Sequence, residues 1–147
     1  MEKPNYITSM DSRTFSKWLN AKATQLRNRD KKRFRRLNWQ IRDKNWYKCE
    51  IESAFGKCDD GKDYYSGELL NWDLLGRYGT DYEYNVEIKR KVPSFNHVFE
   101  DNNTGTFHLV ICSWLVNDMI SDQRIEDVIF LCQKIKTHRN IAACQEN

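Results

Sequence analysis

The fold is decided by the stretch PSFNHVFEDNNTGTFHLVICSWLVNDMISD, residues 93–122. The segment from Val86 to Val98 alternates in the manner of a half-buried strand. Pro93 within it predicts a sheet edge or a bulge, because proline cannot donate to the ladder. The run TFHLVIC at 106–112 is rich in β-branched and aromatic residues and predicts a second strand after the loop EDNNTG. These two runs are expected to pair as antiparallel strands.

A helix is expected after the second strand. Either Ser121 or Asp122 is predicted to cap its N-terminus, and the apolar residues from Ile125 to Ile135 recur at helical spacing. Two antiparallel strands followed by a helix, with further helices before them, predict an α+β fold.

The part of the chain before the hairpin is expected to be mainly helical. Residues 11–37 and 39–55 both carry apolar residues at three-to-four spacing, and the glycine and aspartate residues of 56–63 predict a loop. We therefore divide the chain into a basic helical region, residues 1–62, and a ββα region, residues 63–147. The two regions are expected to form one compact unit.

The first predicted helix ends in a strongly basic run, RNRDKKRFRR. Its basic residues are Arg27, Arg29, Lys31, Lys32, Arg33, Arg35 and Arg36. Aromatic residues lie within or soon after this run (Phe34, Trp39, Trp46 and Tyr47), and cations beside aromatics suit phosphate contact with stacking on bases. A solvated helix face is the alternative. We favour contact with nucleic acid, in which these residues position the protein and do not read the sequence.

The net charge of +3 is the balance of two unlike parts. Residues 1–48 hold 14 Lys and Arg against 4 Asp and Glu, whereas residues 49–147 hold 10 against 17. Such asymmetry predicts an anionic partner for the basic part.

Other classes of protein are disfavoured by composition. The five cysteines and three histidines lack the close pairs that a structural zinc site needs. No apolar run approaches the ~20 residues of a membrane span, and the first residues lack the apolar region of a signal peptide. We expect a cytoplasmic protein without a membrane partner, associated with the nucleoid if it binds DNA.

Three short motifs follow one another in the chain: YSGELLNW at 65–72, PSFNH at 93–97 and NDMISD at 117–122. In this order and spacing they resemble the ββα-metal finger of HNH nucleases, as found in small bacterial HNH-like proteins. The resemblance covers roughly residues 63–138.

The resemblance implies a metal-dependent endonuclease that hydrolyses DNA. His97 corresponds to the general base, and an imidazole suits this role because its ordinary pKa lies near working pH. Asn96 and Asn117 correspond to the ligands of one divalent cation, Mg²⁺ or Mn²⁺, which keeps several waters and needs few protein ligands. The alternative is that these are ordinary structural residues, a strand-end histidine and a turn-capping asparagine.

Two positions depart from the family pattern. Asn96 stands where the family usually has an acid, and Ile120 stands where related sequences often have lysine. An amide oxygen brings no negative charge, so weak cation binding is expected. Asp118, Asp122, Glu100 and Asp101 are nearby carboxylates that could compensate. The second hypothesis is therefore a degenerate or disabled HNH-fold protein that acts as a nucleic-acid-binding or assembly module.

Overall fold

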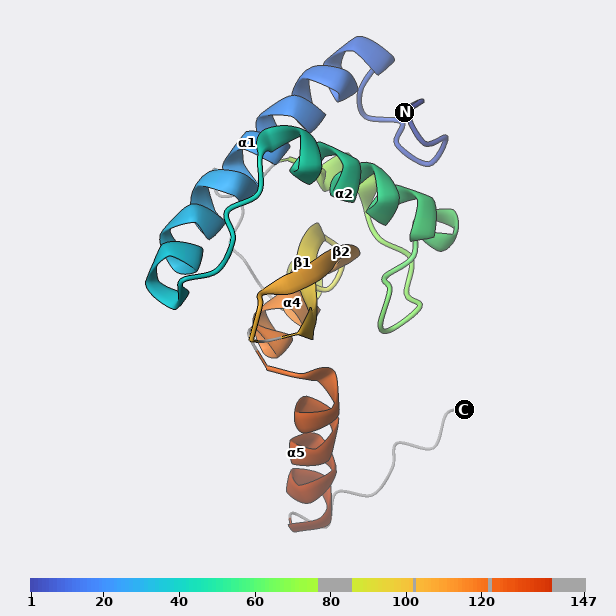
Figure 1. Ribbon diagram of the computed structural model, residues 1–147. Helices are drawn as coiled ribbons and strands as arrows, with labels where there is room; N and C mark the ends of the chain where they lie inside the picture. Colours follow the sequence, from blue (N-terminus) through green and yellow to red (C-terminus); the bar gives the residue numbers. More distant parts are fainter. Residues whose placement is uncertain (77–85, 102, 122, 139–147) are drawn as a thin grey trace.

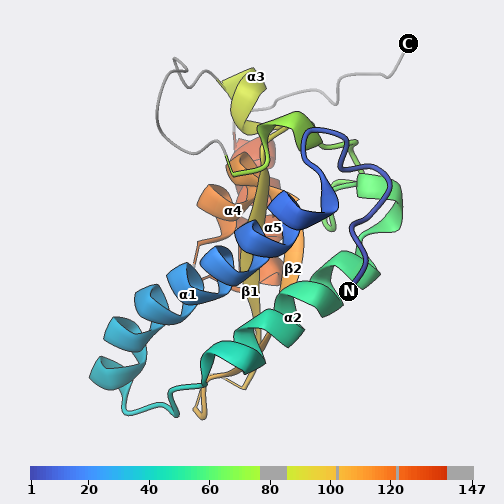
Figure 2. The same ribbon diagram turned by 90° about the horizontal axis from the view of Figure 1, so that it is seen from above.

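A computed structural model describes residues 1–76, 86–101, 103–121 and 123–138. The described residues have an α+β architecture: five α-helices, two short 3-10 helices and one two-stranded antiparallel sheet. The two helices at the start of the chain lie over one face of the sheet, and the two helices that follow the sheet lie on its other side (Figures 1 and 2).

The two long helices, α1 (Ser12–Leu37) and α2 (Lys44–Lys57), confirm the two helices expected before the hairpin. Asp11 caps α1 by accepting a hydrogen bond from the backbone N–H of Thr14, and Asp43 caps α2 in the same way. Asn38 ends α1 in the left-handed conformation with φ 55°. The chain therefore turns back, and α2 runs beside α1 (Figure 2).

The sheet is a hairpin of β1 (Pro93–Asp101) and β2 (Thr106–Ser113). Its turn closes where the N–H of Gly105, at φ 69°, donates to the carbonyl of Asp101. Pro93 is the first residue of its strand, where the missing N–H is tolerated, and the register is irregular between Phe99 and Asp101.

The expected strand over residues 86–92 is wrong. Val86–Lys89 forms the single-turn helix α3, and the N–H groups of Lys91 and Val92 both donate to the carbonyl of Ile88. These local hydrogen bonds hold the backbone in a helical turn. The strand begins only at Pro93, which is the first residue that pairs with the partner strand.

The core lies between the sheet and the two long helices. Alternation along the strands places Phe95, Phe107, Leu109 and Ile111 on the helix-facing side, and each is at most 4 % exposed. They join one buried cluster with side chains of both helices: Phe15, Leu19, Ala23, Leu26, Phe34, Tyr47, Ile51, Ala54 and Phe55. The core therefore draws on both sequence regions, 1–62 and 63–147.

Two helices follow the hairpin, α4 (Trp114–Ile120) and α5 (Ile125–His138). Ser113 caps α4, which packs against both strands on the face opposite α1 and α2. Ser121 is not the cap of α5: it ends α4 with φ 48°, and its N–H donates to the carbonyl of Asn117. The other expected cap, Asp122, lies outside the described residues.

A buried aspartate fastens the loop before the hairpin to the end of β2. The carboxylate of Asp63, 2 % exposed, accepts hydrogen bonds from the backbone N–H groups of Tyr65, Ser66 and Ser113. This loop carries the expected YSGELLNW motif, so Asp63 sets the position of Tyr65 relative to the sheet.

In the part of the chain that the structure describes, no helix has both the length and the apolar character that crossing a membrane requires.

Candidate functional site

The three residues expected to form a nuclease site line one cavity. Asn96 and His97 are neighbours on β1 and therefore face opposite sides of the sheet, Asn96 toward α4 and His97 toward α1. The cavity lies at the edge of β1, where both side chains reach it, and Asn117 enters from α4. Its volume is about 310 Å³. It is lined by Arg29, Asp30, Arg33, Asn96, His97, Asn117, Asp118 and Ser121.

Both asparagines are held by hydrogen bonds through their amide nitrogens. Asn96, 2 % exposed, donates from Nδ2 to the hydroxyl of Tyr65 at 3.1 Å. Asn117 donates from Nδ2 to the hydroxyl of Ser94 at 3.1 Å. This use of the NH₂ groups leaves the two carbonyl oxygens, Oδ1 of each residue, as the acceptors for a ligand.

His97 lies among aromatic rings and is held by two residues of α1. Its Nε2 lies 2.8 Å from Oδ2 of Asp30, and Nη2 of Arg29 lies 3.1 Å from its Nδ1. Its ring centroid is 4.5 Å from that of Phe107 and 5.9 Å from that of Phe99. Since an arginine can only donate, these contacts fit the tautomer with the proton on Nε2.

Asp30 is a site residue that the sequence interpretation did not include. It is the only acid in the run 27–36, it is 3 % exposed, and its Oδ2 also accepts from the hydroxyl of Tyr47 at 2.9 Å. One signal was present in the sequence: Asp30 lies midway between Leu26 and Phe34 at four-residue spacing, on the face that α1 buries. A carboxylate there requires a buried partner, and that partner is His97.

The pKa values of this pair are shifted in ways that keep Asp30 ionised and His97 neutral near pH 7. Burial lowers the pKa of His97 below its ordinary 6.5, against the opposing effect of the Asp30 carboxylate. Burial alone would raise the pKa of Asp30. The hydrogen bond and charge of His97, with Arg29 and Tyr47, lower this pKa overall. The neutral ring is the form that can accept a proton.

The lowered pKa of His97 gives a prediction for stability against pH. Below pH ~6.5 the unfolded chain takes up a proton on this ring that the folded chain does not, so the free energy of unfolding falls as the pH falls. Asp30 adds an effect of the same sign at lower pH, because its pKa is also lowered. We expect the urea midpoint to fall between about pH 7.5 and about pH 5.5, and His97→Gln to flatten that dependence. An equal pH dependence in the variant would contradict this assignment.

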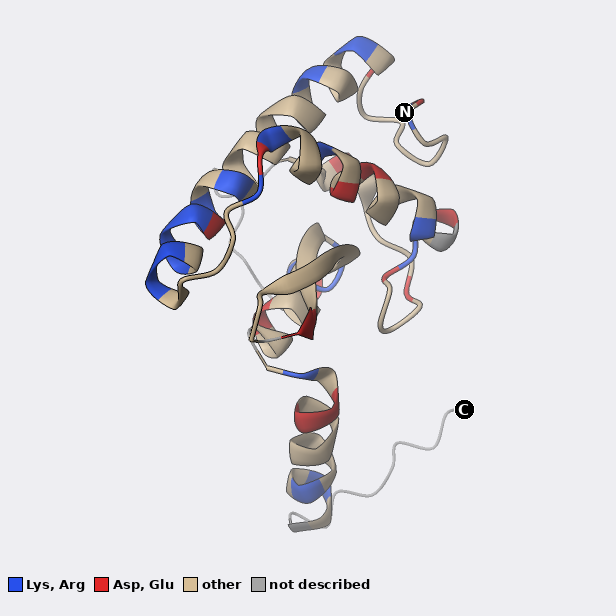
Figure 3. Cartoon of the chain, viewed as in Figure 1, with Lys and Arg blue, Asp and Glu red and all other residues tan. Residues whose placement is uncertain are grey.

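The basic run forms the exposed end of α1 next to the cavity (Figure 3). Arg29 and Arg33 line the cavity itself. The guanidinium carbon of Arg33 lies 4.9 Å from the ring centroid of Phe99. Arg29, Lys32, Arg35 and Arg36 are exposed, and Arg27, Lys31 and Arg33 are partly exposed. The structure therefore places a positive surface and the cavity side by side.

The aromatic residues around the basic run contribute to the core. Phe34 and Tyr47 are each 1 % exposed, and Trp39 and Trp46 are partly buried against the same cluster. Phe34 and Tyr47 are thus inaccessible for the stacking on bases that the sequence suggested. What remains for a nucleic acid at this surface is chiefly contact with its phosphates.

The carboxylates considered as compensating ligands are dispersed. Asp118 lines the cavity, and its Oδ2 lies 3.4 Å from Nζ of Lys89. Glu100 instead contacts His108, and Asp101 accepts hydrogen bonds within the hairpin turn. Asp122 lies outside the described residues. Across the described ranges, no three His, Cys, Asp or Glu side chains cluster as a metal site.

Ile120 stands where sequences of the nuclease family that the chain resembles often have lysine. It is 3 % exposed on α4. The cations that line the cavity, Arg29 and Arg33, come from α1 instead.

Comparison of the chain with known protein families, with curated proteins and with solved structures found no match in any of the three.

Proposed function

We propose that this protein is a metal-dependent endonuclease of the HNH type that hydrolyses phosphodiester bonds in DNA. One observation carries the proposal. A single cavity is lined by Asn96, His97 and Asn117, together with Arg29 and Arg33. A base, amide-oxygen ligands and phosphate-binding cations are the groups that phosphodiester hydrolysis needs in one place.

His97 is the general base of this proposal. Asp30 accepts from Nε2 at 2.8 Å and so leaves Nδ1 without a proton. The same carboxylate stabilises the imidazolium that forms when Nδ1 takes a proton, as a buried acid does behind other catalytic histidines. Asp30 is accordingly a positioning residue, since it acts through His97 and not on the substrate.

Arg29 links substrate binding to this base. In the free protein its guanidinium lies 3.1 Å from Nδ1 of His97, and its Nε lies 3.3 Å from Oδ1 of Asp30. Its side chain is 53 % exposed, so it can turn toward a phosphate that approaches the cavity. A charged phosphate is a stronger hydrogen-bond acceptor than a neutral imidazole. When Arg29 moves from His97 to the phosphate, Nδ1 of His97 becomes accessible.

A water molecule gives its proton to Nδ1 of His97 as its oxygen forms the new bond to phosphorus. The opposite P–O bond breaks, and the leaving oxygen takes a proton from solvent. The imidazolium returns its proton to solvent afterwards, while Arg29 and Arg33 balance the charge of the phosphate.

The oxygen ligands of the cavity fit a weakly held, largely hydrated Mg²⁺ or Mn²⁺. Oδ1 of Asn96 and Oδ1 of Asn117 are hard donors, and the carboxylate of Asp118 lines the same cavity. When bound, such a cation neutralises charge on the scissile phosphate and the leaving oxygen. Two neutral amides give less charge than the acid usual in the family, so cation affinity should be low.

The second candidate function is a disabled nuclease that binds nucleic acid or serves in an assembly. Two observations favour it: Asn96 replaces the acid, and both ring nitrogens of His97 are engaged in the free protein. Such a protein binds DNA in a salt-dependent way that survives chelation of divalent cations, and it cuts under no metal.

A plasmid-nicking assay separates the two. Supercoiled DNA is incubated with the whole chain and Mg²⁺ or Mn²⁺, with a chelator in the control. Conversion to the open circle only with metal supports the endonuclease. DNA retained in a filter-binding assay without any conversion supports the disabled protein.

Asn96→Asp tests the metal assignment directly. The added negative charge should tighten Mn²⁺ binding about tenfold or more, because charge among the ligands tunes such sites. Calorimetric titration measures the affinity, and nicking at subsaturating metal should rise with it. Asn103→Asp in the exposed hairpin turn adds the same charge away from the cavity and should change neither quantity. Equal affinity in the parent and in Asn96→Asp would contradict Asn96 as a ligand.

A further inference from the structure

Helix α5 carries an apolar stripe that the described part of the chain leaves partly exposed, with Ile125 and Val128 half-buried. Ile125, Val128, Cys132 and Ile135 follow one another at spacings of three, four and three, which is the pattern of helices that pair side by side. Ile129 and Leu131 widen the stripe, and they expose 50 % and 58 % of their surface. Apolar surface of this extent on one helix face is typical of an interface.

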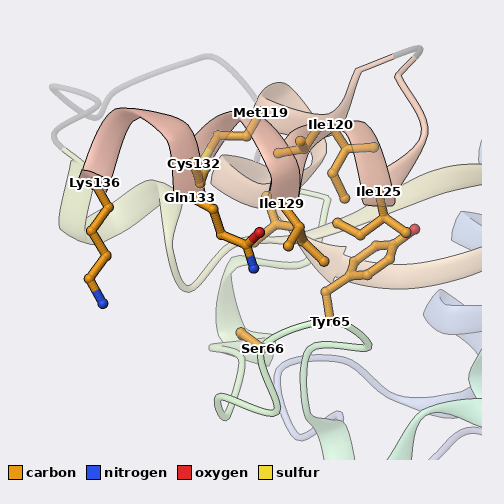
Figure 4. Close-up of a pocket in the computed structure, with 11 residues that line it drawn as sticks. Tyr65, Ser66, Met119, Ile120, Ile125, Ile129, Cys132, Gln133 and Lys136 are labelled. Carbon is orange, nitrogen blue, oxygen red and sulfur yellow. The ribbon is translucent and has the colours of Figure 1, made fainter. Parts of the chain in front are cut away.

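The stripe borders an apolar hollow next to α4. The hollow has a volume of about 380 Å³ and lies between α4, α5 and the loop at Tyr65 (Figure 4). Met119 and Ile120 form its α4 side, Ile125 and Ile129 its α5 side. Met119 is itself 54 % exposed. Among the described elements, α5 extends away from α1, α2 and the sheet (Figure 1).

The distribution of charge along α5 favours a second copy of this helix as the partner that covers the stripe. Glu126 and Asp127 lie in its first turn, whereas Lys134 and Lys136 lie near its C-terminal end. A second α5 in antiparallel orientation brings the acidic end of each helix beside the basic end of the other. A parallel neighbour instead brings like charges together, which is unfavourable.

The size of the surface fits two copies that use both features. A helix of 14 residues is about 21 Å long, and a stable interface buries about 1,200 Å² or more, so contacts beyond the stripe itself favour pairing. Two-fold symmetry doubles every contact, since each α5 also fills the hollow beside Met119 of the other copy.

We propose that the protein forms a homodimer through α5, with the two helices antiparallel about a two-fold axis and each covering the hollow between α4 and α5 of its partner. The proposal concerns a surface separate from the His97 cavity and does not depend on the nuclease function.

Analytical ultracentrifugation of the whole chain tests the apolar contact. The parent should sediment as a dimer at about 50 µM, and Ile129→Lys should weaken dimerisation at least ~10-fold. Phe130→Lys is the matched control: Phe130 is the next residue and is 57 % exposed, but it points away from the stripe, with Nζ of Lys134 4.6 Å from its ring centroid. This variant should dimerise like the parent.

Charge reversal tests the orientation and the identity of the partner. One variant carries Glu126→Lys with Asp127→Lys, and the other carries Lys134→Glu with Lys136→Glu. Each alone should dimerise at least ~10-fold more weakly, because like charges now meet at both ends of the pair. An equimolar mixture should restore dimers, since the two reversed helices are complementary.

A monomeric parent at this concentration overturns the proposal. The proposal is also overturned if Ile129→Lys leaves the dimer intact, or if the mixture of the two charge-reversed variants does not associate. Helical content by circular dichroism accompanies each measurement, so that loss of α5 itself is distinguished from loss of the pairing.

Discussion

His97→Ala should lower metal-dependent DNA cleavage at least ~100-fold, because a positioned general base contributes about 10²–10⁴ in rate. The substitution removes the proton acceptor and leaves Arg29 and Arg33 in place to bind phosphate. Binding of DNA in the presence of a chelator should therefore remain close to that of the parent. Nicking under Mg²⁺ and under Mn²⁺, each followed over time, measures the loss.

His108→Ala is the matched control for this experiment. His108 lies on β2, and its Nδ1 contacts the exposed carboxylate of Glu100 at 3.1 Å, outside the His97 cavity. It should cleave DNA at the parental rate. Equal cleavage by His97→Ala and the parent would remove His97 from the mechanism. Because the His97 side chain is only 10 % exposed, cleavage is compared at temperatures where circular dichroism finds both variants folded.

Asp63→Ala should lower the free energy of unfolding by about 3 kcal/mol. Its carboxylate accepts from three backbone N–H groups, those of Tyr65, Ser66 and Ser113. The buried N–H of Ser113, left without an acceptor, costs about 1–3 kcal/mol, and the two part-buried hydrogen bonds add smaller losses. For a chain of this size such a loss lowers the melting temperature by roughly 6 °C or more. Urea denaturation and a thermal melt measure the two quantities.

Asp73→Ala provides the comparison for Asp63. Asp73 is exposed, and the Oγ1 of Thr8 approaches its carboxylate at 3.5 Å. Its loss should change stability by roughly 0.5 kcal/mol or less. If both variants unfold at the same urea concentration, the three hydrogen bonds of Asp63 do not fasten the loop that carries Tyr65.

The sequence predicted those elements whose periodicity is local. Apolar spacing predicted helices at 11–37 and 39–55, and β-branched content predicted a strand at 106–112. The structure has these elements at 12–37, 44–57 and 106–113, so the second helix begins five residues later than predicted. The prediction of a strand at 86–92 was wrong, because a strand needs a partner strand. The ladder partners of Pro93 and the residues after it are supplied by β2. No ladder pairing is formed by 86–92 among the described residues, where the chain closes a helical turn.

The candidate site was predictable only in part. The order of motifs placed Asn96, His97 and Asn117 together, and they do line one cavity. The partner of His97 was not found, because Asp30 is separated from it by 67 residues and lies within a run that suggested an exposed surface. A contact between residues this far apart produces no periodic pattern in a single sequence, so the sequence does not identify His97 as the partner of Asp30.

Helix α1 contributes both to the basic surface and to the His97 cavity, which limits how this chain could be divided or recombined. Residues 63–138 transplanted into another scaffold would carry His97 without Asp30, and would expose Phe95, Phe107 and Leu109 to water. Residues 63–138 are therefore not a self-sufficient module. Any change that shifts α1 along the sheet moves Arg29 and Arg33 together with the contact between Asp30 and His97.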